Sequence, residues 1–250
     1  VARANSRRGA HLIERRLLPS VERVRNGIEM SDHMMLLGND VVQSTYPTYL
    51  HHKMTQTGTC ASGLPEEVTM RDYIPEERAF LFHAGSGAVH KGLDLVIEAF
   101  ARHPELTLHI TGNYRHEPDF IDEYRAELEL PNIHYHGWVV VASERFEEIL
   151  SQCVAFVLPT CSEGQSPAAA TCMALGLYPI LSIYAGHDLP DGCGIRLSEL
   201  TVDEVEEAIL SLPDDDELLR QVSIIQPYAL DRYSRDTFKN QMIHYLKEWL

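Results

Sequence analysis

Two short segments of the chain hold residues whose types and spacing could do chemistry. In the first, an apolar run at 154–158 is followed by Glu163, Gly164, Gln165 and Ser166, and then by small residues that favour a helix. A carboxylate, a glycine and a helix-capping hydroxyl would therefore stand at the carboxyl end of a buried strand, where open α/β sheets bind ligands. An ordinary strand-to-helix turn has a similar pattern, so this segment alone leaves both interpretations open.

The second segment lies earlier in the chain. A predicted strand at 80–84 leads into Gly85, Ser86 and Gly87, and then to Lys91 at the start of a predicted helix. Glycines let the backbone approach a ligand closely, a helix start offers free N–H groups, and the lysine adds positive charge, so the loop suits a diphosphate. It matches neither the dinucleotide fingerprint nor the P-loop, because the residue spacing differs and no Ser or Thr follows the lysine. A surface lysine in a flexible turn is the alternative.

From about residue 80 onward, short apolar runs alternate with amphipathic segments, which is typical of βαβ units and a parallel sheet. The predicted strands cover residues 80–84, 106–111, 133–137, 154–158 and 178–183. The predicted helices cover residues 90–102, 118–128, 143–152, 167–175, 201–210, 214–226 and 235–250. We therefore predict an α/β fold with a Rossmann-like, doubly wound parallel sheet. Loops that follow parallel strands open on the same sheet edge, so one ligand could touch both segments.

The first 79 residues follow a different pattern. They predict a helix at 9–28, a buried strand at 34–39 and an exposed crossing rich in Gly, Ser and Thr at 56–65. One strand cannot form a domain, so this part is interpreted as a partial N-terminal domain. The predicted units are residues 1–75, a remnant of the acceptor-side domain with its linker, residues 76–230, the ligand-binding domain, and residues 231–250, a C-terminal helix.

Composition narrows the class of protein. The 250 residues carry a formal net charge of -16, which argues against a nucleic-acid groove, because such grooves need clustered Lys and Arg. No apolar run reaches the roughly 18 residues of a membrane span. The basic start has no apolar core behind it, so it is interpreted as a cut inside a longer protein and not as a signal peptide. Five cysteines without a CxxC pair indicate free thiols in a reducing cytosol, and hence a cytoplasmic protein.

Several motifs in order carry a family resemblance: HKGLDLVIEAF at 90–100, LHITG at 108–112, SEG at 162–164 and MALGLYP at 173–179. Over about residues 75–250 the chain resembles the donor half of the retaining GT-B glycosyltransferases, glycosyltransferase family 4 (group 1). The resemblance implies two facing Rossmann-like domains, of which the C-terminal one binds a nucleoside-diphosphate sugar. This donor is a substrate, and no other cofactor is implied.

The resemblance also implies roles for single residues. Lys91 would pair with the donor diphosphate, and Glu163 would hold hydroxyls of the donor sugar. Backbone N–H groups from Gly164 to Ser166 would complete the anion site. The same role follows from the local sequence, because Ser166 can cap the next helix and the helix macrodipole favours a phosphate at this end.

Two positions depart from the family pattern. Ser86 stands five residues before Lys91, where the family has an Arg, and Thr171 stands eight residues after Glu163, where the family has a second Glu on the ribose. A Thr hydroxyl can still hydrogen-bond a ribose, but more weakly than a carboxylate. Arg115 follows the second predicted strand at the same edge of the sheet and could replace the missing cation.

Two further features keep alternative interpretations. His134 and His136 alternate along a predicted strand and could form a metal pair, but no third ligand is evident in the sequence. Trp138 stands where the family places its base-contacting loop, and core packing explains it equally well.

The predicted reaction is transfer of a sugar from a nucleoside diphosphate to an unknown sugar, lipid or protein acceptor, with retention of configuration. Lys91 and the helix-start amides would stabilise the departing diphosphate electrostatically, without a metal. The acceptor would lie across the cleft, on a domain of which little is present. This part of the protein could therefore bind the donor without turning it over. Peripheral membrane contact through the missing domain is also possible. The alternatives are a GT-B epimerase or phosphorylase, and a non-catalytic sugar-nucleotide-binding or scaffolding domain.

Overall fold

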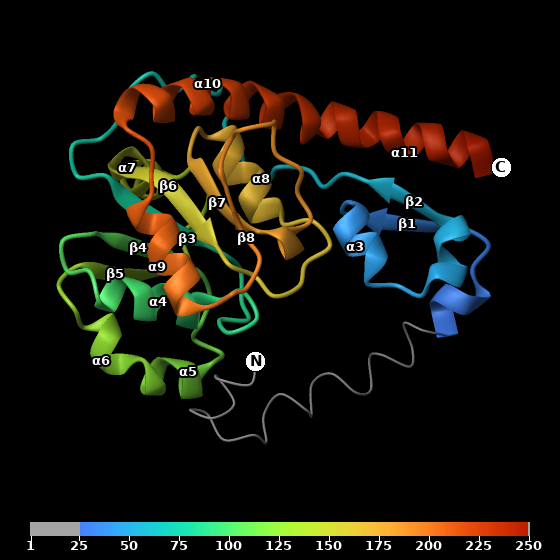
Figure 1. Ribbon diagram of the computed structural model, residues 1–250. Helices are drawn as coiled ribbons and strands as arrows, with labels where there is room; N and C mark the ends of the chain where they lie inside the picture. The colour runs from blue at the N-terminus through green and yellow to red at the C-terminus, as the bar shows by residue number, and fades with distance from the viewer. Residues whose placement is uncertain (1–25, 250) are drawn as a thin grey trace.

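The computed structural model describes residues 26–249, so most of the predicted helix at 9–28 lies outside the described residues. The main sheet has six strands in the order β5-β4-β3-β6-β7-β8, and all neighbouring strands are parallel. The strands are β3 (Ala79–His83), β4 (Leu108–Thr111), β5 (Ile133–Gly137), β6 (Cys153–Leu158), β7 (Tyr178–Ser182) and β8 (Ile195–Leu197). The predicted doubly wound α/β fold is confirmed (Figure 1).

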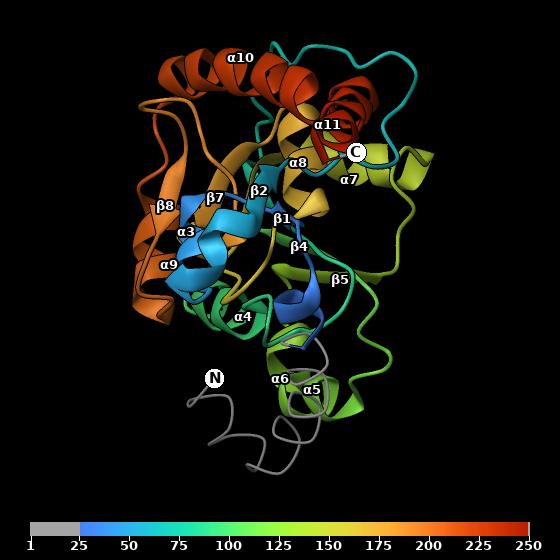
Figure 2. The same cartoon turned by 90° about the vertical axis from the view of Figure 1, so that its right-hand side faces the viewer.

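Helices cover both faces of this sheet. The helices are α4 (Leu93–Ala101), α5 (Pro118–Glu123), α6 (Arg125–Leu128), α7 (Glu144–Gln152), α8 (Pro167–Ala174), α9 (Val202–Leu210), α10 (Asp215–Arg232) and α11 (Arg235–Trp249). Helices α4, α6 and α9 lie on one face, and α7, α8 and α10 lie on the other (Figures 1 and 2). Strand β6 is buried along its whole length because both of its faces are covered.

The five predicted strands are present, with small differences at their ends. The sixth strand, β8, was not predicted, because three residues are too short to show a period. The helix predicted at 118–128 is divided into α5 and α6 at Tyr124. Helix α10 runs past its predicted end at 226 and contains Pro227, the residue type that usually ends a helix.

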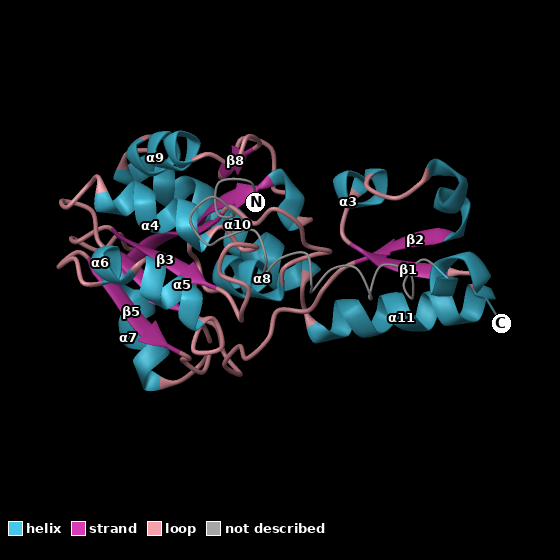
Figure 3. Ribbon diagram, turned by 90° about the horizontal axis from the view of Figure 1, so that it is seen from below, coloured by secondary structure: helices cyan, strands magenta, loops and turns pink. Residues whose placement is uncertain are grey.

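A smaller unit precedes the main sheet. Strands β1 (Met34–Leu37) and β2 (Met54–Thr57) form a two-stranded parallel sheet, with α3 (Asp40–Ser44) and the 3-10 helix η1 (Thr48–Lys53) between them. Figure 3 shows this unit beside the main one, with α11 running along it. The prediction of a buried strand at 34–39 was wrong in part: of the four residues of β1 only Leu36 is buried, because a second layer covers just part of this small sheet.

The C-terminal helix returns to the small unit. Gln241 Oε1 accepts a hydrogen bond from the Gly58 amide at 3.2 Å, and the Tyr245 hydroxyl donates one to the Gln56 carbonyl at 2.8 Å. The rings of His33 and Trp249 stack at 4.9 Å. Helix α11 therefore ties the two ends of the described chain together. Among residues 26–249, no helix is both long enough and apolar enough to cross a membrane.

Candidate active site

A cavity of about 340 Å³ opens at the carboxyl ends of β3 and β6. Strand order reverses between these two strands, because β4 and β5 extend the sheet to one side and β7 and β8 to the other. Such a switch point is where open α/β sheets bind ligands. The cavity is lined by Ser62, Gly63, His83, Ala84, Gly85, Lys91, Trp138, Val139, Val140, Val141, Glu163, Ser166, Pro167 and Ala168.

The two predicted segments meet in this cavity through an ion pair. Lys91 Nζ contacts Glu163 Oε1, and the two side chains are 18% and 11% exposed. Lys91 lies in the turn before α4 and not within the helix as predicted, because α4 begins only after Gly92. Gly92 has φ +77°, and a Cβ there would lie 2.3 Å from the Pro159 carbonyl oxygen. This close approach brings the Lys91 loop against the loop that follows β6.

The glycine loop after β3 does not present its helix-side amides to the cavity. The Gly87 amide donates to Glu117 Oε1 at 2.7 Å, and the Ala88 amide donates to both carboxylate oxygens of Glu117 at 3.1 and 3.2 Å. Glu117 is only 8% exposed. The predicted diphosphate cradle at Gly87 is therefore filled by a carboxylate of the protein. Gly85 lines the cavity, and Ser86 is exposed beside it.

Ser166 occupies the predicted capping position of α8. Its hydroxyl accepts a hydrogen bond from the Ala169 amide at 3.4 Å, and its own amide donates to the Ala185 carbonyl at 3.3 Å. Its carbonyl accepts from Nε2 of His187, which is fully buried. Burial lowers the pKa of His187 to about 4, so this imidazole stays neutral. The start of α8, a helix of eight residues, thus forms a fixed wall of the cavity.

Gln165 and Thr171 are buried, and their hydrogen bonds hold the connecting segment, residues 56–65, which leads from the small unit to the main one. Gln165 Oε1 accepts a hydrogen bond from the Thr59 amide at 2.5 Å. Thr171 Oγ1 accepts one from the Ser62 amide at 3.0 Å and donates one to the Ser62 carbonyl at 3.2 Å. Neither Gln165 nor Thr171 is among the residues that line the cavity in the described part of the chain. Their bonds instead fix the segment that contributes Ser62 to the cavity wall.

Glycines let three loops meet behind Glu163. A Cβ on Gly186 would lie 1.7 Å from the Gly164 carbonyl oxygen, and one on Gly38 would lie 2.6 Å from the same atom. Gly186 and Gly38 also have φ values of +73° and +134°, which side chains rarely adopt. The Gly164 loop is therefore held between the small unit and the loop after β7, and Gly164 itself is exposed.

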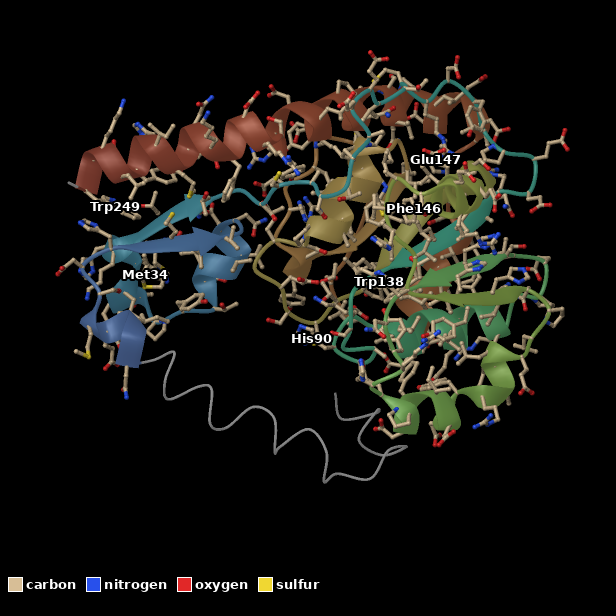
Figure 4. The ribbon with its side chains drawn as sticks, turned by 180° about the vertical axis from the view of Figure 1, so that it is seen from behind. Met34, His90, Trp138, Phe146, Glu147 and Trp249 are labelled. Carbon is tan, nitrogen blue, oxygen red and sulfur yellow. The ribbon has the colours of Figure 1, made fainter. Side chains whose placement is uncertain are left out.

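Arg115 and Trp138 differ in how they relate to the cavity. Arg115 is exposed and is not among the cavity-lining residues, so its predicted role as a replacement cation stays a prediction. Trp138 lines the cavity and is 62% exposed, as is Val140. Core packing therefore does not explain Trp138. Figure 4 shows Trp138 and His90 at the edge of the main unit that faces the small unit.

The histidine pair has a third neighbour that the sequence did not indicate. His109 Nδ1 and His136 Nε2 share a hydrogen bond at 2.9 Å, and the rings of His109 and His134 lie 5.1 Å apart across β4 and β5. Arg145 also bonds His136, and burial lowers the pKa of His109 and of His136 to about 4. Within residues 26–249, no group of three or more His, Cys, Asp or Glu side chains is arranged to hold a metal ion.

Comparison with known proteins identifies the class. Residues 77–215 match the family model described as "Glycosyl transferases group 1", and this match covers more than half of the chain. The chain belongs to the group 1 glycosyltransferases. No curated protein sequence matches it.

Solved structures share the fold at low sequence identity. Anabaena HepE in complex with UDP and glucose has a TM-score of 0.68 and 12% identity, over 90% of this chain and 66% of HepE. Sucrose-phosphate synthase from Thermosynechococcus elongatus has a TM-score of 0.69 and 15% identity, over 89% of this chain and 59% of that protein. A Rickettsia africae glycosyltransferase has a TM-score of 0.68 and 11% identity, over 87% of this chain and 63% of that protein. The chain thus spans less than two thirds of each of these relatives.

Proposed function

We propose that this chain is the donor-binding part of a glycosyltransferase that moves a sugar from a nucleoside diphosphate to an acceptor with retention of configuration, as in family 4. The observation that carries the proposal is the Lys91–Glu163 pair, which faces a cavity at the switch point of the sheet. A cation and a carboxylate side by side suit a substrate that joins an anionic diphosphate to a hydroxyl-rich sugar.

In the proposed mechanism the diphosphate replaces Glu163 as the partner of Lys91. The start of α8 also faces the cavity, and its macrodipole favours negative charge there. As the bond to the sugar breaks, negative charge grows on the departing diphosphate, and Lys91 and the helix start stabilise it electrostatically. Glu163, released from the ion pair, accepts hydrogen bonds from hydroxyls of the donor sugar.

Trp138 is the proposed contact for the base of the nucleotide. Its exposed ring and Val140 give the cavity an apolar wall beyond the ion pair. Aromatic rings stack on any nucleobase, so this wall selects for a nucleotide and not for one base. Support for a uridine nucleotide comes from HepE, whose structures contain UDP and UDP-glucose. Ser62 and Gly63, which follow the small unit in the chain, also line the cavity, and we place the acceptor on the side of the small unit.

Calorimetric titration with UDP, GDP, ADP and TDP tests donor binding. We expect one or more of them to bind, and we expect Lys91→Ala to weaken that binding by at least about tenfold, because a charge-assisted contact worth about 1.5–3 kcal/mol is lost. Lys239→Ala, an exposed lysine on α11, is the matched control. Thermal unfolding of both variants checks that the fold is retained.

Two results would redirect the proposal. If none of the four nucleotides binds at millimolar concentration, the non-catalytic scaffolding alternative is favoured. If a nucleotide binds, products formed from the labelled nucleotide-sugar distinguish transfer from the epimerase and phosphorylase alternatives. Retention is read from the anomeric configuration of the product.

A further inference from the structure

A second cavity, of about 310 Å³, lies on the other side of the Lys91 loop. It is lined by Val89, Gly92, Asp94, Leu95, Pro159, Cys161, Glu199, Leu200 and Thr201. None of these residues lines the first cavity. The two cavities are separated by the loops that carry Lys91 and Glu163.

Asp94 is the unusual residue of this cavity. It lies in the first turn of α4 and is only 6% exposed. Its Oδ1 atom is buried and has no hydrogen-bond partner among the described residues. Burial raises the pKa of its carboxyl to about 6, so Asp94 is still ionised at neutral pH. A buried carboxylate charge without a cationic side-chain partner among the described residues is costly, and Asp94 lines the cavity, so a cation bound there would offset that cost.

The remaining walls define what such a ligand would be. Glu199 adds a second acidic residue, whereas Val89, Leu95 and Leu200 are apolar. A cation with several N–H donors would satisfy the carboxylate, and a short hydrocarbon part would fit against the apolar side. The volume is at the lower end of the range for small-molecule sites, which suits a small ligand.

One wall of the cavity is held in an unfavourable conformation. Leu200 has φ +54°, a value that non-glycine residues rarely adopt. The Glu204 carboxylate fixes it by accepting hydrogen bonds from the amides of Ser198, Glu199 and Leu200 at 2.6 to 3.2 Å. Strained residues that are held in this way often belong to ligand sites. The cavity is therefore a formed feature of the fold and not a gap between mobile loops.

We propose that this second cavity binds a small organic cation, an alkylammonium or a guanidinium, through the carboxylate of Asp94. The inference does not depend on the proposed transferase reaction, because it uses neither Lys91 nor Glu163. Cys161 provides a built-in reporter: its thiol lines the cavity and lies 3.5 Å from His90 Nδ1. A bound cation would cover this thiol.

The test uses the whole chain with n-butylammonium chloride as the probe and n-butanol as the neutral control of similar shape, at constant ionic strength. The rate of iodoacetamide alkylation at Cys161 is measured by peptide mass spectrometry, with Cys60 as an internal reference. We expect butylammonium to slow alkylation of Cys161 about fivefold when its concentration is about four times Kd, and to raise Tm. Butanol should do neither.

Two variants decide whether Asp94 is responsible. Asp94→Asn removes the charge with little change of shape and should abolish both effects. Asp215→Asn, in the exposed first turn of α10, should leave them unchanged. Methylguanidinium should behave like butylammonium. Equal protection by butanol, protection that persists in Asp94→Asn, or no protection by either cation up to its solubility limit would overturn the proposal, because the cavity would then hold only solvent.

Discussion

Replacing Glu163 by Gln tests the roles proposed for both members of the ion pair. Glutamine keeps the shape of the side chain but removes a negative charge that lies against Lys91 Nζ and is mostly shielded from solvent. A diphosphate bound to Lys91 would sit near that charge. For like unit charges about 5 Å apart at an effective dielectric constant of about 20, the repulsion is about 3 kcal/mol. The native carboxylate therefore opposes the binding of a bare nucleotide.

We expect Glu163→Gln to bind UDP at least about tenfold more tightly than the native chain, which corresponds to about 1.4 kcal/mol. UDP-glucose should gain less, because the hydrogen bonds from the sugar hydroxyls to a charged acceptor, worth about 1.5–3 kcal/mol, are lost. The ratio of the two affinities should thus shift toward the bare nucleotide. Calorimetry with both compounds measures the ratio directly.

The control is Glu77→Gln, an exposed residue just before β3, at the opposite end of the sheet from the cavity. It should change neither constant. Weaker UDP binding in Glu163→Gln, or an unchanged ratio of UDP-glucose to UDP affinity, would refute the assignment of Glu163 to the sugar and of Lys91 to the diphosphate.

Further substitutions test the packing and charge around the site. Thr171→Val should lower the free energy of unfolding in urea by about 1–2 kcal/mol, because two bonds to the exposed Ser62 are lost, whereas UDP affinity should change little. Thr171→Ser keeps the hydroxyl but loses a fully buried methyl group, so it should lose only about 0.8 kcal/mol. Gly186→Ala should destabilise more strongly, because its Cβ would lie 1.7 Å from a carbonyl oxygen, and Tm measures this loss. Asp94→Asn should stabilise by up to about 3 kcal/mol above pH 6, since burial raises this pKa to about 6, and the gain should vanish near pH 4. Burial lowers the pKa of His187 to about 4, so its imidazole is neutral in the folded protein but becomes protonated below about pH 6.5 in the unfolded chain. The free energy of unfolding should therefore fall as the pH is lowered from 6.5 to 4, and His187→Gln should make this fall less steep.

The local sequence pattern was sufficient to predict the strand and the helix that carry the site. The buried strand β6, the capping hydroxyl of Ser166 and the helix that follows depend on residues close in sequence, so alternation and capping rules identify them. The geometry of parallel strands placed the loops of Lys91 and Glu163 at one edge of the sheet, but it did not predict that these two side chains pair with each other.

Contacts between distant loops could not be predicted in the same way. Glu117 follows Gly87 by 30 residues and reaches it from the loop after β4, and no periodicity connects the two. His109 joins His136 through the register of neighbouring strands, which a sequence pattern does not give. In both cases the partner is chosen by the packing of the sheet. A motif that suits an external anion or metal can therefore be satisfied by the chain itself.

The connecting segment at 56–65 is a further example of contacts that the sequence did not predict, and these contacts help to form the cavity. The prediction of an exposed crossing at 56–65 was wrong in part: residues 56 and 57 belong to β2, and Thr57, Thr59 and Ala61 are buried. The sequence gives no reason to connect this segment with α8. In the structure, Gln165 and Thr171 bond the backbone of this segment at Thr59 and Ser62, and Ser62 then lines the cavity. Gln165 and Thr171 thus fix the position of Ser62 in the cavity wall, and changes at these two positions should move this wall without touching the ion pair.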